Sequence, residues 1–78
     1  MFRPTHRLLS NAAHELLIQR DAWRRSADEL EERGPTYQRR ANANRVRAIE
    51  LERVAEWLYQ QAAMAPSNPM PTESEDEP

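Results

Sequence analysis

An alanine recurs at every seventh residue through the second half of this chain, and this ladder constrains the fold more than any other feature. Steps of four and three residues extend it into a continuous stripe, made of Tyr37, Ala41, Asn44, Ala48, Leu51, Ala55, Leu58, Ala62 and Ala65. Such a stripe is typical of a helix that lies along another helix. Because small side chains fill the seven-residue positions, the neighbouring helix is expected to carry large ones.

The first half of the chain supplies a helix of that kind. Residues 5–33 contain no helix breaker, and Thr5 is a candidate N-cap after Pro4, with residues 1–4 as a flexible lead-in. The apolar positions again follow steps of four, three and seven, and they are Leu9, Ala13, Leu16, Trp23, Ala27 and Leu30. Arg20 occupies the one missing position of this stripe. We expect it to reach solvent along its alkyl stem or to pair with Glu52 or Glu56.

The sequence Gly34-Pro35-Thr36 separates the two stripes. Glycine can adopt the left-handed conformation that ends a helix, proline cannot continue one, and Thr36 can cap the next. A turn over residues 34–36 predicts an antiparallel hairpin of two equal helices, 5–33 and 36–64, so the fold class is all-α. Each helix is about 43 Å long at roughly 1.5 Å per residue.

Folding the chain at this turn predicts a register in which paired residue numbers add to 71. The large residues then meet the ladder as Leu30 with Ala41, Trp23 with Ala48, Leu16 with Ala55 and Leu9 with Ala62. The alternate layers are Ala27 with Asn44, Arg20 with Leu51, and Ala13 with Leu58. Large side chains opposite small ones allow close packing.

A second apolar surface predicts further association, because two helices of this size bury little surface alone. The residues expected to form a protein interface are Ile18, Val46, Ile49, Arg53, Val54, Trp57 and Met64. The simplest cover for an exposed tryptophan is a second copy of the chain, which gives a dimeric four-helix bundle. Trp57 could equally serve a different partner protein, since tryptophan and arginine dominate interface hot spots.

The turn end of the hairpin is rich in arginine, which suits contact with phosphate backbones. The candidate nucleic-acid contacts are Arg24, Arg25, Arg39, Arg40, Arg45 and Arg47. Four acidic residues, Asp28, Glu29, Glu31 and Glu32, lie in the same region. Their spacing favours ion pairs on a solvated surface over a nucleic-acid site.

No catalytic or metal-binding pattern is present in the sequence. The chain has no cysteine, and His6, Ser10 and His14 share a helix face without the further ligands or the orienting acid that a site needs. Ile18 stands where a zincin-like helix requires its second histidine. We therefore expect no enzyme activity, no cofactor, no metal and no small-molecule substrate, and two solvated histidines.

The last residues differ in composition from the rest. Residues 66–78 hold four prolines and four acids, whereas residues 1–65 hold all 11 arginines and nine acids, so a body of charge +2 precedes a tail of −4. This Pro-rich acidic tail is expected to be disordered. It could mimic nucleic acid, shield the arginine-rich end, bind a basic partner or, as we favour, aid solubility. No apolar run fits a membrane span or a signal peptide, which predicts a cytoplasmic protein.

These features predict a non-enzymatic interaction protein, a homodimeric accessory regulator or inhibitor that modulates another protein. All basic residues are arginine and alanine is abundant, which suggests a GC-rich coding sequence such as that of a bacterium or phage, acting in the host cytoplasm if phage-encoded. The alternatives are a nucleic-acid-binding accessory protein that uses the turn end and a structural subunit of a larger assembly.

Overall fold

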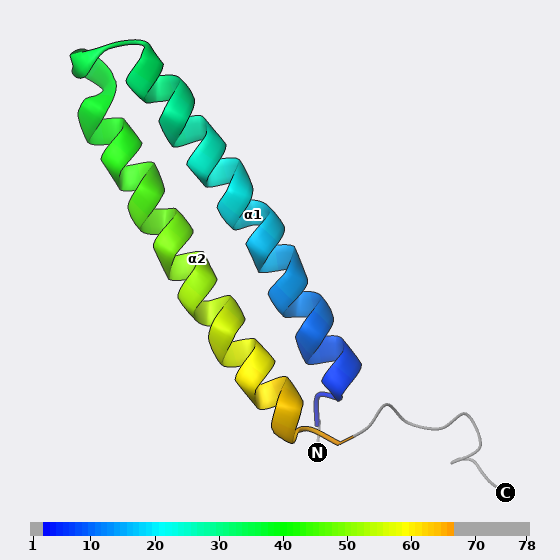
Figure 1. Cartoon of the computed structure of the whole chain (residues 1–78). Coiled ribbons are helices and arrows are strands. Elements are labelled where there is room, and N and C mark those ends of the chain that lie inside the picture. The colour runs from blue at the N-terminus through cyan, green and yellow to red at the C-terminus, as the bar shows by residue number, and fades with distance from the viewer. Residues whose placement is uncertain (1–2, 67–78) are drawn as a thin grey trace, which may run out of the picture.

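Two long helices lie side by side in opposite directions, as the heptad stripes predict. The computed structural model describes residues 3–66, in which α1 spans His6–Glu32 and α2 spans Gln38–Met64. A single 3₁₀ turn, η1 (Pro35–Tyr37), joins them at one end, and the chain enters and leaves at the other, the open end (Figure 1). No strand is present between residues 3 and 66, so the all-α hairpin is confirmed. The predicted acidic tail lies almost entirely outside the described residues.

The ends of the helices follow local backbone chemistry. The Thr5 hydroxyl accepts a hydrogen bond from the Leu8 amide at 3.2 Å, which is the predicted N-cap. The second helix begins two residues later than the sequence predicts, because the turn after Gly34 winds more tightly. The Tyr37 amide donates to the Gly34 carbonyl at 3.1 Å, an i→i+3 bond. Gly34 itself has φ 118°, a conformation that other residues rarely adopt.

The open end of the hairpin is tied together by His6. Its amide donates to the Pro66 carbonyl at 3.1 Å, and its Nδ1 donates to the Ala62 carbonyl at 2.9 Å. The Ala62 carbonyl lies in the last turn of α2 and also accepts from the Ala65 amide at 3.1 Å, and the Pro66 carbonyl lies just beyond the helix. His6 is therefore a structural contact at the open end, although the residue is exposed as the sequence predicts.

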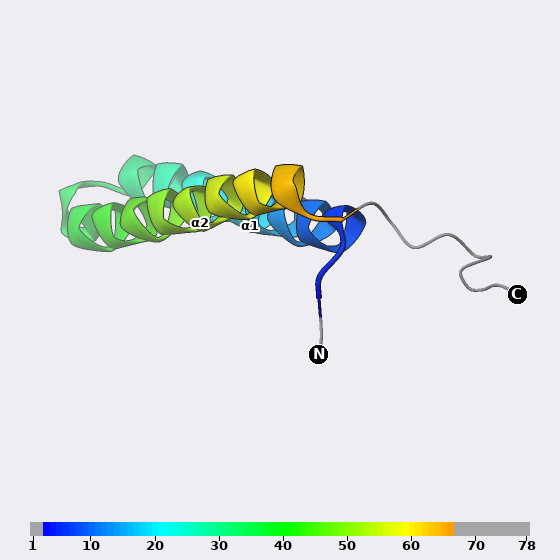
Figure 2. The same cartoon turned by 90° about the horizontal axis from the view of Figure 1, so that it is seen from below.

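The interior of the hairpin consists almost entirely of alanine. The buried residues are Ala13, Ala27, Ala41, Ala48, Ala55 and Ala62, together with Asn44. Among residues 3–66 no large side chain is fully buried, and Leu16, Trp23, Leu51 and Leu58 are half-buried. Figure 2 shows why: the two helices form a single pair, and within residues 3–66 nothing covers either broad side. A side chain longer than alanine therefore emerges beside the neighbouring helix.

The observed contacts between α1 and α2 agree with the predicted register. Asn44 Nδ2 donates to Ser26 Oγ at 3.1 Å, one residue from its expected partner Ala27. The Arg20 guanidinium lies 3.5 Å from the Glu52 carboxylate, one residue beyond Leu51. Of the two carboxylates predicted as partners for Arg20, the structure has Glu52.

Candidate interaction surfaces

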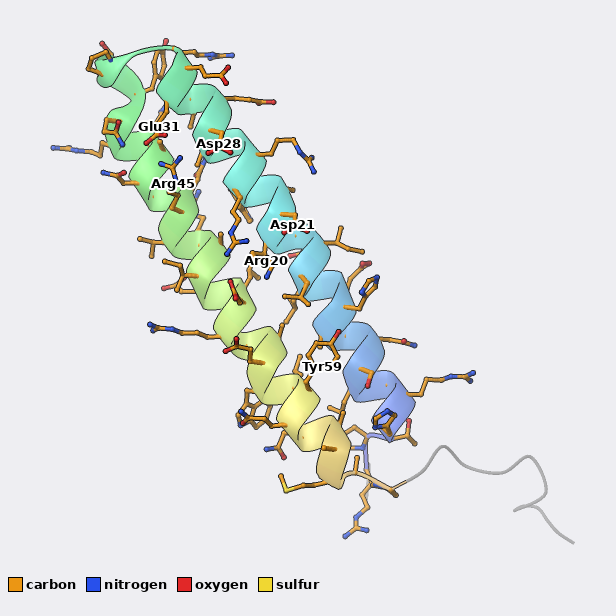
Figure 3. All side chains as sticks on the ribbon, viewed as in Figure 1. Arg20, Asp21, Asp28, Glu31, Arg45 and Tyr59 are labelled. Carbon is orange, nitrogen blue, oxygen red and sulfur yellow. The ribbon has the colours of Figure 1, made fainter. Side chains whose placement is uncertain are left out.

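One broad side of the hairpin, here called the ion-paired side, is lined by charged side chains that bridge the two helices. Arg45 of α2 is at its centre (Figure 3). Its Nη1 and Nη2 donate to the two carboxylate oxygens of Glu31 at 2.6 and 2.7 Å, and Nη2 also donates to Asp28 at 2.8 Å. Such a fork fixes both distance and orientation between the helices.

Further along the same side, Glu52 of α2 accepts from Arg24 at 2.9 Å and lies near Arg20. Arg20 also pairs with the adjacent Asp21 at 2.9 Å, and only 19% of its side chain is exposed. The arginine that interrupts the apolar stripe of α1 thus turns toward this side, where carboxylates and solvent neutralise it. The ion-paired side thus presents satisfied charges between the turn and Arg20, and the partly exposed Ile49 and Tyr59 add apolar surface to it (Figure 3).

The Arg45 fork holds the pKa of the Glu31 carboxyl at about 2, below its usual 4.5, and a hydrogen bond from Gln38 adds to the effect. The same hydrogen bonds raise the pKa of Arg45. Because the folded-state pKa of Glu31 is lowered, the contribution of this pair to stability is present above about pH 4.5 and is lost as the pH falls toward 2.

This lowered pKa can be measured directly. The ¹³C shift of the Glu31 carboxyl is expected to titrate with a midpoint near 2, and Arg45→Gln is expected to return the midpoint toward 4.5. Arg40→Gln is the matched control, because Arg40 is exposed and makes no contact with Glu31. A midpoint near 4.5 in the wild type would mean that the fork does not form in solution.

The opposite broad side, here called the apolar side, carries the large side chains that the alanine interior cannot hold. The Arg47 guanidinium lies over the Trp23 ring, 4.8 Å from its centroid, and Arg47 Nη1 donates to Asn44 Oδ1 at 3.1 Å. Trp23 shares a hollow with Leu51 and Val54. The buried Asn44 amide is therefore satisfied at both ends.

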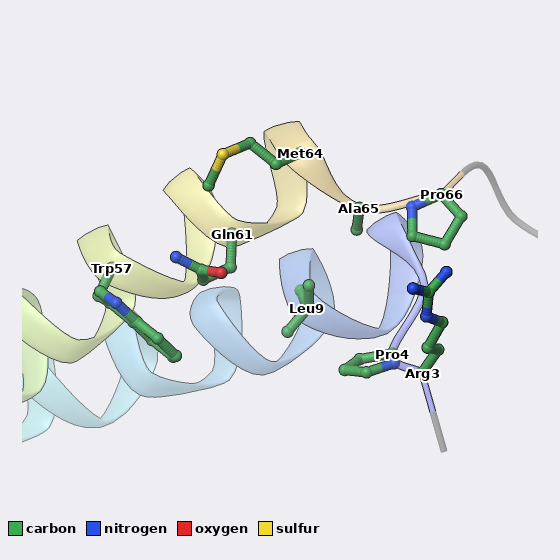
Figure 4. A pocket seen from close by; sticks show the side chains of 8 residues that line it. All are labelled: Arg3, Pro4, Leu9, Trp57, Gln61, Met64, Ala65 and Pro66. Atoms are coloured by element: carbon green, nitrogen blue, oxygen red, sulfur yellow. The ribbon is translucent and has the colours of Figure 1, made fainter. Parts of the chain in front are cut away.

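A second hollow on the apolar side lies at the open end. Leu9 of α1 and Trp57 of α2 border it together, and Gln61 and Met64 complete the edge formed by α2 (Figure 4). Trp57 is 55% exposed and Met64 is 73% exposed. Large apolar side chains from both helices thus meet at this end without any covering element among residues 3–66.

The two hollows belong to one surface. Leu16 lies seven residues from both Leu9 and Trp23, and Leu58 lies seven residues from Leu51, so helical periodicity places both leucines between the hollows. We call this surface the apolar strip, and its members are Leu9, Leu16, Trp23, Leu51, Val54, Trp57 and Leu58. Sequence reasoning assigned most of them to the hairpin interior, and the structure leaves them half-buried or exposed.

The predicted interface residues do not form one surface. Val54, Trp57 and Met64 border the hollows of the apolar side. Ile49 lies in a hollow of the ion-paired side with Arg24, Asp28 and Arg45. The remaining three, Ile18, Val46 and Arg53, are exposed and lie on the outer sides of the helices, opposite the alanine interior. The signal that could have identified the apolar strip is the stripe Leu9, Leu16, Trp23 and Leu30.

The candidate nucleic-acid contacts divide into two groups. Arg24 pairs with Glu52, and Arg45 pairs with Glu31 and Asp28. Arg47 lies over the Trp23 ring. Arg25, Arg39 and Arg40 are exposed, and none of the three makes an ion pair or side-chain hydrogen bond within residues 3–66. Half of the predicted basic surface is thus occupied by the hairpin itself.

No group of three or more His, Cys, Asp and Glu side chains suited to a metal ion occurs in the described part of the chain. Neither helix there contains an apolar stretch long enough to cross a membrane. Comparison with known protein families, with curated proteins and with solved structures finds no match for this chain.

Proposed function

We propose that this chain is a non-enzymatic interaction module in which two hairpins pack through their apolar strips into a four-helix bundle. The observation that supports the proposal is an interior of small residues beside an uncovered strip of leucine, valine and tryptophan. Burying a large apolar side chain contributes roughly 1.5–3 kcal/mol, so covering this strip adds stability that the alanine interior lacks. A second copy presents the same strip and is the simplest complement.

The bundle would act by binding and modulating another protein in the cytoplasm. When the apolar strip is covered by a second copy, Ile18, Val46 and Arg53 remain on the outer sides of the helices, where they are exposed. Arginine is enriched in binding hot spots, so Arg53 is the residue of this group that best supports contact with another protein. Nucleic acid is the weaker candidate partner, because Arg24, Arg45 and Arg47 already have partners within the hairpin.

The oligomeric state tests this proposal. Light scattering coupled to size exclusion is expected to give twice the chain mass of 9.1 kDa for the wild type at micromolar concentration. Trp57→Ala removes an exposed side chain of the strip and is expected to shift the equilibrium toward monomer without changing the helical circular dichroism spectrum. A stable, fully helical wild-type monomer would refute the proposal.

A further inference from the structure

We infer that the two hairpins associate antiparallel and that the acidic tail of each copy binds Arg39 and Arg40 of the other. This inference rests on the proposed dimer and specifies its orientation. Arg39 and Arg40 open α2 next to the turn, are exposed, and have no ion pair or side-chain hydrogen bond within residues 3–66. Glu73, Glu75 and Asp76 belong to the segment that follows Pro66 at the other end of the hairpin.

Like charges disfavour the parallel orientation. Arg40 stands seven residues before Arg47, so the two arginines extend the edge of the apolar side toward the turn. A parallel bundle would bring both arginines of one copy against the same arginines of the other, and two tails of charge −4 together. Such like-charge juxtaposition is costly at an interface. An antiparallel bundle instead sets each turn end beside the open end of the other copy.

The dimensions of the hairpin also favour contact between copies over contact within one chain. From Arg40 to Met64 is 24 residues along α2, or roughly 36 Å at 1.5 Å per residue, and Pro66 lies two residues beyond. The seven residues from Pro66 to Glu73 span at most about 25 Å when fully extended. An acidic residue of the tail therefore reaches Arg40 of its own chain only when the tail is almost fully extended along α2, which is costly in conformational entropy.

In the antiparallel bundle the distance is short. The apolar strip runs along α1 from Leu9 to Trp23, so its centre is Leu16. Gln38 contacts Glu31 and Asn44 contacts Ser26. Arg40 lies between Gln38 and Asn44 on α2, so it is near the level of Leu30 on α1. A two-fold axis at Leu16 then places the partner's His6 about 6 Å from Arg40 along the bundle. Since His6 is hydrogen-bonded to Pro66, the partner's tail begins beside Arg39 and Arg40.

The chain has no cysteine, so disulfide trapping can test this arrangement. One copy carries Ser74→Cys, and a separately purified copy carries Ala43→Cys, an exposed site one turn after Arg39 and Arg40. The matched control replaces Ala43→Cys by Ala63→Cys, an exposed alanine at the other end of α2. After mixing and mild oxidation, the mixed disulfide at position 43 is expected to form about tenfold faster than at position 63, reflecting a higher effective concentration.

The faster disulfide formation at position 43 is expected to depend on Arg39 and Arg40. Arg39→Gln with Arg40→Gln, or about 1 M salt, where the Debye length falls to about 3 Å, is expected to reduce the tenfold ratio toward one. Equal rates at positions 43 and 63, a faster rate at position 63, or a ratio that survives loss of both arginines would overturn the inference. Light scattering on the same mixtures distinguishes failure of the tail contact from failure of the proposed dimer. A dimer with equal rates contradicts only the tail contact, whereas a monomer contradicts the proposed function as well.

Discussion

A Val54→Glu chain is expected to run as a monomer at concentrations where the wild type is a dimer, whereas Val46→Glu is expected to remain dimeric. The two valines form a closely matched pair, since both lie on α2 and they are 49% and 51% exposed. Only Val54 shares a hollow with Trp23 and Leu51 on the apolar side. Val46 lies on the outer side of α2, which a second copy at the apolar strip would leave in solvent.

The size of this effect follows from the cost of burying an unpaired carboxylate. A charge left without a partner at a covered interface costs about 3 kcal/mol or more. That energy corresponds to roughly a hundredfold increase in the dissociation constant, and two-fold symmetry introduces the charge twice. Sedimentation or light scattering over a concentration series measures it. If Val46→Glu dissociates the dimer and Val54→Glu does not, the interface lies on the outer side of α2 instead.

An Ala55→Leu variant is expected to lose about 1–3 kcal/mol of unfolding free energy. Ala55 is 0% exposed and belongs to the alanine interior, where small side chains are buried between the two helices. A leucine there must push the helices apart or adopt a strained rotamer, which loses packing along both helices. The loss is expected to be larger than that from any surface change.

The matched control for this variant is Ala43→Leu, which makes the same chemical change at an exposed position of the same helix. Its expected effect is within about 0.5 kcal/mol, because alanine and leucine differ little in helix propensity. Urea unfolding followed by circular dichroism, at one fixed protein concentration, compares the two. Equal midpoints for both variants would show that the helices do not pack through Ala55.

The hairpin could be predicted from the sequence because its signals are local or periodic. Gly34 and Pro35 mark a turn between the two apolar stripes. The alanine ladder repeats at a spacing that is typical of a helix beside another helix. The register followed from the same spacing, and the Asn44–Ser26 contact lies within one residue of it. The ion pair between Arg20 and Glu52 was one of the outcomes expected from the sequence, since a guanidinium between two apolar stripes needs a carboxylate or solvent.

The division into an ion-paired side and an apolar side could not be predicted in the same way. A seven-residue stripe shows that Trp23 faces the neighbouring helix, but it does not show that the side chain stays half-buried in a hollow with Leu51 and Val54. That outcome depends on how closely the helices approach, which is a tertiary property. The role of His6 was missed for a different reason: its acceptors are the carbonyls of Ala62 and Pro66, and backbone groups leave no pattern in the sequence.

Because the alanine ladder is regular, the packing between the two helices would change little if one helix moved along the other by a whole repeat. If α2 moved along α1 by seven residues, roughly 10.5 Å, each alanine would occupy the place of the next one and the helices could approach as closely as before. The polar contacts have no such repeat, because the Arg45 fork meets Glu31 and Asp28 at one position only. Alanine thus allows the two helices to pair, and the short turn together with the polar contacts at the helix edges selects one alignment.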